Sequence, residues 1–222
     1  PEVNLMVRQS ITDITIGLDR SGSMSSICKP TIRAFNRFVK SQCQGPDEAF
    51  LSLVQVGDQY EPVYSRMPSD RAPNLTSHTS VPRGSTALFD AIGRTIESAH
   101  QRLVRSGMDS YANVVMVIQT DGFENASRHY SRDRINAMIS RFRDQHRWEF
   151  VFLGANQDAI MSAASVGIPR GAAITYGATC NGTHAVFDIL GQKMSARRRA
   201  SVQNEQPAPF HFNDDDRAQS MQ

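Results

Sequence analysis

Oxygen-bearing side chains follow two apolar runs of this chain. Asp19-Arg20-Ser21-Gly22-Ser23 comes directly after the run 14–18, and Asp121 follows the run 114–118. A third group, Gly84-Ser85-Thr86, precedes a segment with helical spacing. Carboxylate and hydroxyl oxygens are hard donors that suit Mg²⁺ or Mn²⁺, and no softer ligand for zinc or copper stands among them. The candidate metal ligands are therefore Asp19, Ser21, Ser23, Thr86 and Asp121.

These donors meet only if the fold brings their loops together. In an open parallel sheet, ligands bind beyond the carboxyl ends of the strands. If the strands predicted over 11–18 and 114–118 are neighbours, all three loops converge on one point. Two carboxylates and three hydroxyls would then suit an octahedral ion, with positions left for water or a ligand. The alternative is purely local, because Asp and Ser also favour turns and helix N-caps.

Strand-like and helix-like segments alternate along the chain, which predicts an α/β fold with a mostly parallel sheet. Strands are expected at 11–18, 50–56, 60–65, 114–118, 150–153 and 172–176. Helices are expected at 25–43, 86–105, 131–145, 158–166 and 184–199. The turn at 57–59 makes the third strand an antiparallel edge. We expect a three-layer α/β/α sandwich, doubly wound and Rossmann-like.

Composition limits the organisation and the partners. The 222 residues predict one domain over 1–200, followed by a polar acidic tail over 201–222 whose composition predicts disorder. A formal charge of +2 is too small to indicate a nucleic acid or a membrane as partner. No run is long enough to span a bilayer. Nucleic acid and membrane partners are therefore not expected.

Cysteine usage and the opening segment predict a cytoplasmic protein. The three cysteines form neither a disulfide framework nor a zinc pattern, which predicts reduced thiols. Residues 1–10 mix polar and charged side chains, unlike a signal peptide.

The five candidate ligands carry a family resemblance. The chain resembles a von Willebrand factor type A (vWA) domain over about 11–199, and the five residues match the complete metal-ion-dependent adhesion site (MIDAS) of that family. The stretches 81–86, 123–127 and 152–158 resemble more narrowly small stand-alone bacterial and phage proteins of this type. The resemblance implies a vWA fold with Ser21, Ser23 and Thr86 on the metal, and with Asp19 and Asp121 bound directly or through water.

The resemblance also implies a function without a chemical step. An aspartate or glutamate of a protein partner would complete the coordination of a bound Mg²⁺ or Mn²⁺ ion. The chain would then be a binding module and not an enzyme. The alternative is a Mg²⁺-dependent enzyme acting on phosphorylated or nucleic-acid substrates. It lacks the second aspartate of a D-x-D pattern at Asp19-Arg20-Ser21 and a lysine beside Gly84-Ser85-Thr86. The oligomeric state is left open.

Several side chains near the motif have two interpretations. Arg20 either faces the incoming carboxylate or is a solvated loop residue. Glu124 and Asn125 either support the site or belong to a surface turn. Asp90 is expected to be structural and Asp158 to be a helix N-cap. The run Arg197-Arg198-Arg199 either touches phosphates or complements a helix C-terminus.

Overall fold

Six strands form one sheet in the order β3-β2-β1-β4-β5-β6 in the computed structural model, which describes residues 11–108, 112–203 and 205–222. The strands are β1 (Ile11–Asp19), β2 (Glu48–Val56), β3 (Tyr60–Pro68), β4 (Asn113–Thr120), β5 (Glu149–Ala155) and β6 (Ala173–Tyr176). Every neighbouring pair is parallel except β2 and β3, which form the antiparallel edge. This confirms the predicted sheet, whereas the prediction for residues 1–10 lies outside the described residues.

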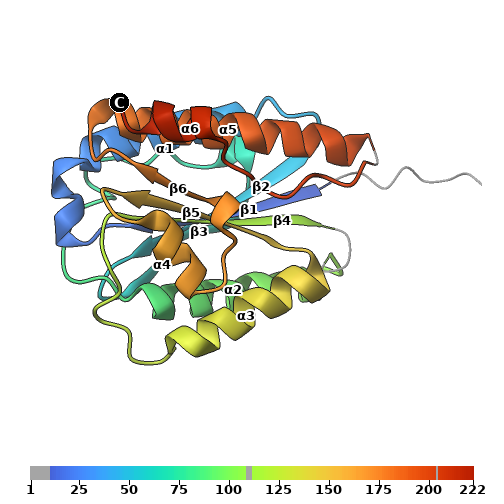
Figure 1. The fold of residues 1–222 in the computed structure, drawn as a ribbon. Helices are drawn as coiled ribbons and strands as arrows, with labels where there is room; N and C mark the ends of the chain where they lie inside the picture. Colours follow the sequence, from blue (N-terminus) through green and yellow to red (C-terminus); the bar gives the residue numbers. More distant parts are fainter. Residues whose placement is uncertain (1–10, 109–111, 204) are drawn as a thin grey trace, which may run out of the picture.

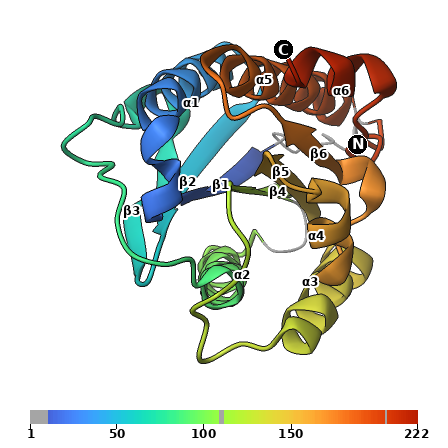
Figure 2. The same ribbon diagram turned by 60° about the vertical axis from the view of Figure 1, so that its left-hand side comes forward.

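Helices cover both faces of the sheet (Figures 1 and 2). They are α1 (Cys28–Gln42), α2 (Leu88–Arg105), α3 (Arg132–His146), α4 (Ala159–Ser165), α5 (Cys180–Val202) and α6 (Asp214–Ser220). One face carries α1, α5 and α6, and the other carries α2, α3 and α4. The predicted three-layer α/β/α architecture is therefore confirmed. Among the described residues, no helix has the length and apolarity needed to cross a membrane.

The two central strands place the candidate ligands at one edge. Ile14 and Ile16 of β1 and Val117 of β4 are fully buried, as expected of strands covered on both faces. The parallel register pairs Leu18 with Gln119, so both strands end at the same edge of the sheet. The strand neighbourhood on which the convergence of the loops depends is therefore confirmed.

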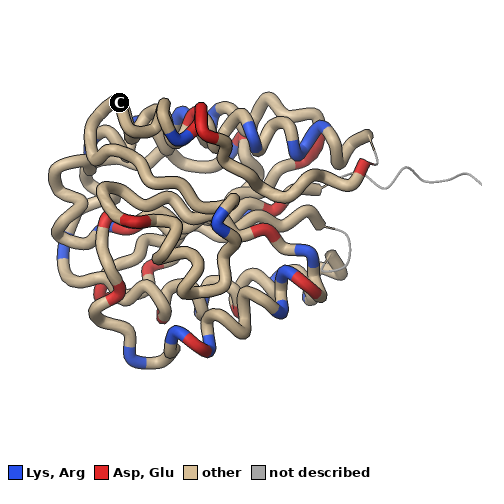
Figure 3. The backbone as a smooth tube through the Cα atoms, viewed as in Figure 1, with Lys and Arg blue, Asp and Glu red and all other residues tan. Residues whose placement is uncertain are grey.

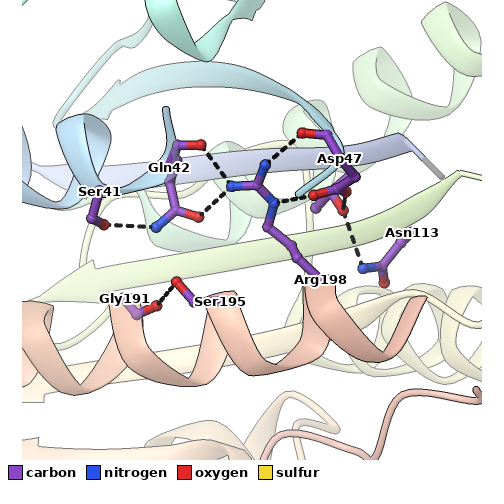
Figure 4. Close-up of polar contacts among 8 residues, drawn as sticks. Ser41, Gln42, Asp47, Asn113, Gly191, Ser195 and Arg198 are labelled. Carbon is purple, nitrogen blue, oxygen red and sulfur yellow. Dashed lines mark hydrogen bonds and ion pairs between the residues drawn. The ribbon is translucent and has the colours of Figure 1, made fainter. Parts of the chain in front are cut away.

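A buried ion pair joins α5 to the loop before β2, at the end of the sheet away from the candidate ligands (Figure 4). The side chains of Arg198 and Asp47 are each 1% exposed, and Arg198 Nε donates to Asp47 Oδ1 at 2.6 Å. A second guanidinium nitrogen donates to the backbone carbonyl of Gln42 at 2.7 Å. Removing one partner of a buried pair typically costs about 3–5 kcal/mol, so this contact holds α5 firmly against the loop after α1.

This network settles the arginine run at 197–199. Arg197 Nε donates to Asn113 Oδ1 at 2.8 Å, and Arg198 is committed to Asp47. Two of the three arginines are thus internal structural groups, and not a phosphate-binding cluster. The helix also continues to Val202, three residues beyond its predicted end.

The segment after residue 204 is folded, so the prediction of a disordered tail is wrong for 205–222. Phe210 and Phe212 are 6% and 1% exposed, and α6 begins with a capping box between Asn213 and Asp216. Asp216 also pairs with Lys193 of α5 at 2.7 Å. The acidic run thus starts a helix packed on α5 and does not lie at the candidate ligands of its own chain.

This segment satisfies the outer edge of β6. The carbonyl oxygens of Gly171, Ala173 and Thr175, at alternate positions of the chain, each accept one hydrogen bond from it. The donors are Phe212 N at 2.8 Å, Arg217 Nη1 at 2.9 Å and Ser220 Oγ at 2.8 Å. An uncovered edge strand is a template for pairing with another chain. Residues 205–222 therefore act as an edge cap.

Deleting residues 205–222 should lower the stability of the fold and cause self-association, because the β6 edge and its apolar surface become exposed. Sedimentation velocity at several concentrations measures the association, and thermal unfolding measures the stability. The substitution Gln219→Ala, at an exposed position of α6, is the control. A truncated chain with the same association state and the same thermal unfolding as the full chain would contradict the edge-cap assignment.

Candidate metal centre

Asp19 is the last residue of β1, and its carboxylate is held inside the turn that follows. The residue is 2% exposed, and Ser21 N donates to its Oδ1 at 2.7 Å. The chain then continues into a short 3₁₀ helix (Gly22–Ser26). The backbone N–H of Arg20 still bonds Val56 O of β2 at 2.8 Å. The strand thus places Asp19 at the carboxyl end of the sheet, and these hydrogen bonds restrict its side chain and the turn that follows.

The two serine hydroxyls connect the first loop to the second. Ser21 Oγ and Ser23 Oγ are 3.0 Å apart, and Ser23 Oγ donates to Asp121 Oδ1 at 2.7 Å. Asp121 follows β4, so this bond joins positions 98 residues apart in the sequence. The contact shows that the loops after β1 and β4 converge as the sequence predicts.

Thr86 enters the cluster from the third loop. The point that a Cβ on Gly122 would occupy lies 3.5 Å from Thr86 Oγ1 and 3.9 Å from Ser23 Oγ. Both hydroxyls therefore flank Gly122, directly beside Asp121. The structure brings all five predicted side chains to one place.

A glycine shapes the approach to Thr86. Gly84 has a φ of +69°, in the left-handed region that side-chain-bearing residues avoid. Its carbonyl accepts from Gly22 N at 3.1 Å, and Arg83 N donates to Arg20 O at 2.7 Å. The third loop therefore runs beside the first, which keeps Thr86 close to the serines.

Thr120 positions Asp19, a role that the sequence motif does not reveal. Its hydroxyl donates to Asp19 Oδ2 at 2.5 Å and also accepts from Gly122 N at 3.1 Å. Thr120 thus fixes the free oxygen of the Asp19 carboxylate and the turn that carries Asp121. A threonine directly before the second aspartate is the only sequence signal for this role.

Asn125 and Glu124 support the site rather than forming a free surface turn. Asn125 Oδ1 accepts from Thr86 N at 3.0 Å, and Asn125 N donates to Thr86 O at 3.1 Å. Glu124 Oε2 accepts from Phe89 N at 2.9 Å, and its Oε1 accepts from the backbone of Ala126 and Ser127. The loop after β4 is therefore bonded to the backbone of Thr86 and to the first turn of α2.

Asp90 anchors the remainder of that loop, as its predicted structural role requires. It is 8% exposed, its Oδ1 accepts from His129 N and Tyr130 N at 2.9 Å each, and its Oδ2 accepts from Arg128 N at 3.0 Å. Burial opposes ionisation, but these three donors outweigh it and lower the pKa of the Asp90 carboxyl below its ordinary value. The charged side chain of Asp90 therefore holds the loop 121–130 against α2.

Burial raises the pKa of the two carboxyls at the centre. For Asp19 the hydrogen bonds from Thr120 and Ser21 oppose this shift, and the nearby Asp121 adds to it. For Asp121 the bond from Ser23 opposes it. Two partly desolvated carboxylates near each other are costly without a cation. The electrostatics of the cluster thus favour a bound positive charge.

The donor set fits a hard divalent cation. The side chains gathered at the site offer two carboxylates and three hydroxyls, a set that suits Mg²⁺ or Mn²⁺. Among the described residues, no group of three or more His, Cys, Asp or Glu is arranged to hold a metal. The oxygen donors gathered at the ends of β1 and β4 are what make this centre the candidate metal site.

Arg20 satisfies neither of its predicted roles. Its side chain is 4% exposed and pairs with the Glu61 carboxylate of β3, which also binds Arg83 at 2.9 Å. The prediction of a solvated or partner-facing arginine is wrong, because the antiparallel edge brings Glu61 beside the end of β1. By contrast, the N-cap prediction for Asp158 is confirmed, since its Oδ1 accepts from Met161 N at 3.0 Å.

No protein-family model and no curated protein sequence matches the chain. Solved structures match its fold. The pilus adhesin SpaC from Lactobacillus rhamnosus GG aligns with a TM-score of 0.65 and 11% identity, over 85% of this chain and 30% of that one. Proximal thread matrix protein 1 from the mussel byssus, with a zinc-occupied MIDAS motif, aligns with a TM-score of 0.61 and 14% identity, over 82% and 47%.

A von Willebrand factor type A structure from Catenulispora acidiphila aligns with a TM-score of 0.59 and 14% identity, over 84% of this chain and 43% of that one. The chain thus spans less than half the length of each of these three proteins. The likeness establishes that the chain has a vWA-type fold.

Replacing Asp90 by Asn should destabilise the fold by about 1–3 kcal/mol, because the amide NH2 is a donor. In either orientation it would face the N–H of Arg128 or the N–H groups of His129 and Tyr130 and leave them without an acceptor. A lowered pKa means that the unfolded state binds the proton more tightly. The stabilisation by Asp90 is therefore present above the ordinary aspartate pKa and is lost as the pH falls through the folded-state pKa.

Urea unfolding between pH 3 and pH 7 measures both effects, and the variant should show a weaker acid dependence than the unchanged protein. Asp133→Asn, at an exposed position in the first turn of α3, is the control. If the Asp90 variant has the same stability and the same acid dependence as the unchanged protein, this role of Asp90 is contradicted.

Proposed function

We propose that this vWA-type chain is a metal-dependent protein-binding module. A Mg²⁺ or Mn²⁺ ion would be held by Asp19, Ser21, Ser23, Thr86 and Asp121. An aspartate or glutamate of a protein partner would complete its coordination. The proposal contains no chemical step.

One observation carries this proposal. Side chains from three separate loops gather at the carboxyl end of two neighbouring parallel strands, with Ser23 bonded to Asp121 and Thr86 beside both. Ligands of open α/β sheets bind at this edge. The gathered groups are all hard oxygen donors, and hydrogen bonds from neighbouring residues hold them in place.

The charge of the donor set favours a partner carboxylate. Three of the five donors are neutral hydroxyls, and the Asp19 carboxylate already accepts from Thr120 and from Ser21 N. A divalent cation that contacts the three hydroxyls directly, with the two carboxylates bound through water, keeps strong attraction for an additional anion. Ser23 is exposed and Asp121 is half-buried, so a side chain from outside can approach.

The surroundings favour a protein as the partner. Phe123, next to the centre, is 69% exposed, and Met161, after β5, is 65% exposed. Exposed aromatic and methionine side chains are enriched in protein interfaces. Acidic and basic residues are interspersed along the chain (Figure 3), and the formal net charge is only +2, whereas nucleic-acid-binding surfaces are strongly basic.

Two of the matched structures support the proposal. One is a pilus adhesin, and the other holds zinc at its MIDAS motif. The thiols of Cys28, Cys43 and Cys180 are free, which is compatible with the cytoplasmic location that we propose.

The substitutions Asp121→Asn and Thr86→Val should each weaken Mn²⁺ binding at least tenfold, because each removes an oxygen ligand and nearly keeps the side-chain shape. Isothermal titration calorimetry should give one Mn²⁺ per unchanged chain, displaced by excess Mg²⁺. Asp158→Asn, an aspartate after β5 with a capping role, should leave the affinity unchanged.

Equal Mn²⁺ affinity of all variants would contradict the assignment of these ligands. Turnover of a phosphorylated substrate that requires Asp19 and the metal would favour a Mg²⁺-dependent enzyme instead. Thermal unfolding of each variant without metal separates loss of a ligand from loss of the fold.

A further inference from the structure

A groove of about 600 Å³ lies next to the candidate metal centre. The start of α1 forms one wall and the segment 77–82 forms the other. The lining side chains used below are Ser25, Ser26, Lys29, Arg33, Ser80 and Val81. The residues that directly adjoin these walls meet at the metal centre, where Gly22 N bonds Gly84 O and Arg83 N bonds Arg20 O. The groove therefore continues the surface on which the metal ligands lie.

The groove is positively charged and none of its lining residues is acidic. Lys29 and Arg33 are one helical turn apart and lie on the same side of α1. Within the described residues no carboxylate is at ion-pair distance from either of them. The helix also begins without a side-chain cap and without an acidic residue in its first turn, so its positive dipole end is not compensated.

A serine hydroxyl in the groove makes no hydrogen bond within the described part of the chain. Ser80 is 5% exposed and lines the groove. Its backbone groups are bonded to Thr76 O and to the Cys28 thiol, whereas its Oγ has no hydrogen-bond partner within the described part of the chain. Because Ser80 lines the groove and its Oγ is not engaged by the protein, this hydroxyl can donate to a ligand in the groove. It is an observation independent of the charges on α1.

We infer that the groove binds a second acidic side chain of the protein partner. The partner's first acidic side chain completes the coordination of the metal ion. This inference rests on the proposed function and specifies its partner as an extended acidic peptide segment. Lys29 and Arg33 would pair with the second carboxylate, and the Ser80 hydroxyl would donate to it. Val81, which is 46% exposed, offers apolar contact to the chain between the two acids.

The geometry sets the spacing of the two acids. From Ser23 the chain passes through the 3₁₀ helix, which ends at Ser26, into the first turn of α1, where Lys29 lies. At a rise of about 1.5–2 Å per residue, these six residues span at most on the order of 10 Å. An extended strand advances about 3.3 Å per residue. The two acidic residues of the partner should therefore stand about three positions apart.

The test uses two fluorescent peptides in Mg²⁺ buffer. One carries two aspartates three positions apart, and the other has asparagine in place of the second. Fluorescence anisotropy should show at least fivefold tighter binding of the two-acid peptide to the unchanged protein. The double substitution Lys29→Gln with Arg33→Gln should remove this advantage and leave the one-acid affinity unchanged, and Ser80→Ala should reduce the advantage.

The matched control is the double substitution Arg37→Gln with Lys40→Gln, which removes the same charge from exposed positions of α1 outside the groove. It should keep the advantage. If both double variants behave as the unchanged protein does, the groove inference fails and the proposed function stands. If neither peptide needs Mg²⁺ or Asp121, the proposed function itself fails. Displacement of the two-acid peptide by inorganic phosphate or a short oligonucleotide at lower concentration than by acidic peptides would also overturn the inference.

Discussion

The parallel pairing of β1 with β4 is the constraint on which the candidate metal centre depends. The register sets Leu18 beside Gln119, so that Asp19 and Asp121 emerge at the same edge of the sheet. Both strands are buried on both faces, and a slip by one residue would turn their apolar side chains to the wrong sides. The position of the centre is therefore determined by the packing of the core.

The precision of the centre comes from polar contacts around this core. Thr120 holds Asp19, Asn125 holds both backbone groups of Thr86, and Asp90 binds three successive N–H groups of the loop after β4. These contacts restrict loops that would otherwise be free to move, so the donors stand ready for a cation. Preorganised ligands lower the ordering cost of binding.

Local sequence predicted the fold and the gathering of the five donors, because apolar runs followed by acids mark the ends of buried strands. It did not predict the burial of Arg20 or the packed C-terminal segment. Arg20 is buried because Glu61 comes from a different strand, and the C-terminal segment is ordered because Phe210 and Phe212 pack on a sheet edge far away in the sequence. Neither partner is visible in the neighbouring residues. The polar composition of 205–222 therefore misled the prediction of disorder.

The central claim is that the bound ion keeps a coordination position for a carboxylate from outside the chain. Water-proton relaxation of the Mn²⁺-loaded protein measures it most directly, because it reports the exchangeable waters on the ion. Saturation with an aspartate-containing peptide should remove about one such water, whereas the matched asparagine peptide should remove none. An unchanged number of waters with the aspartate peptide fully bound would contradict the account.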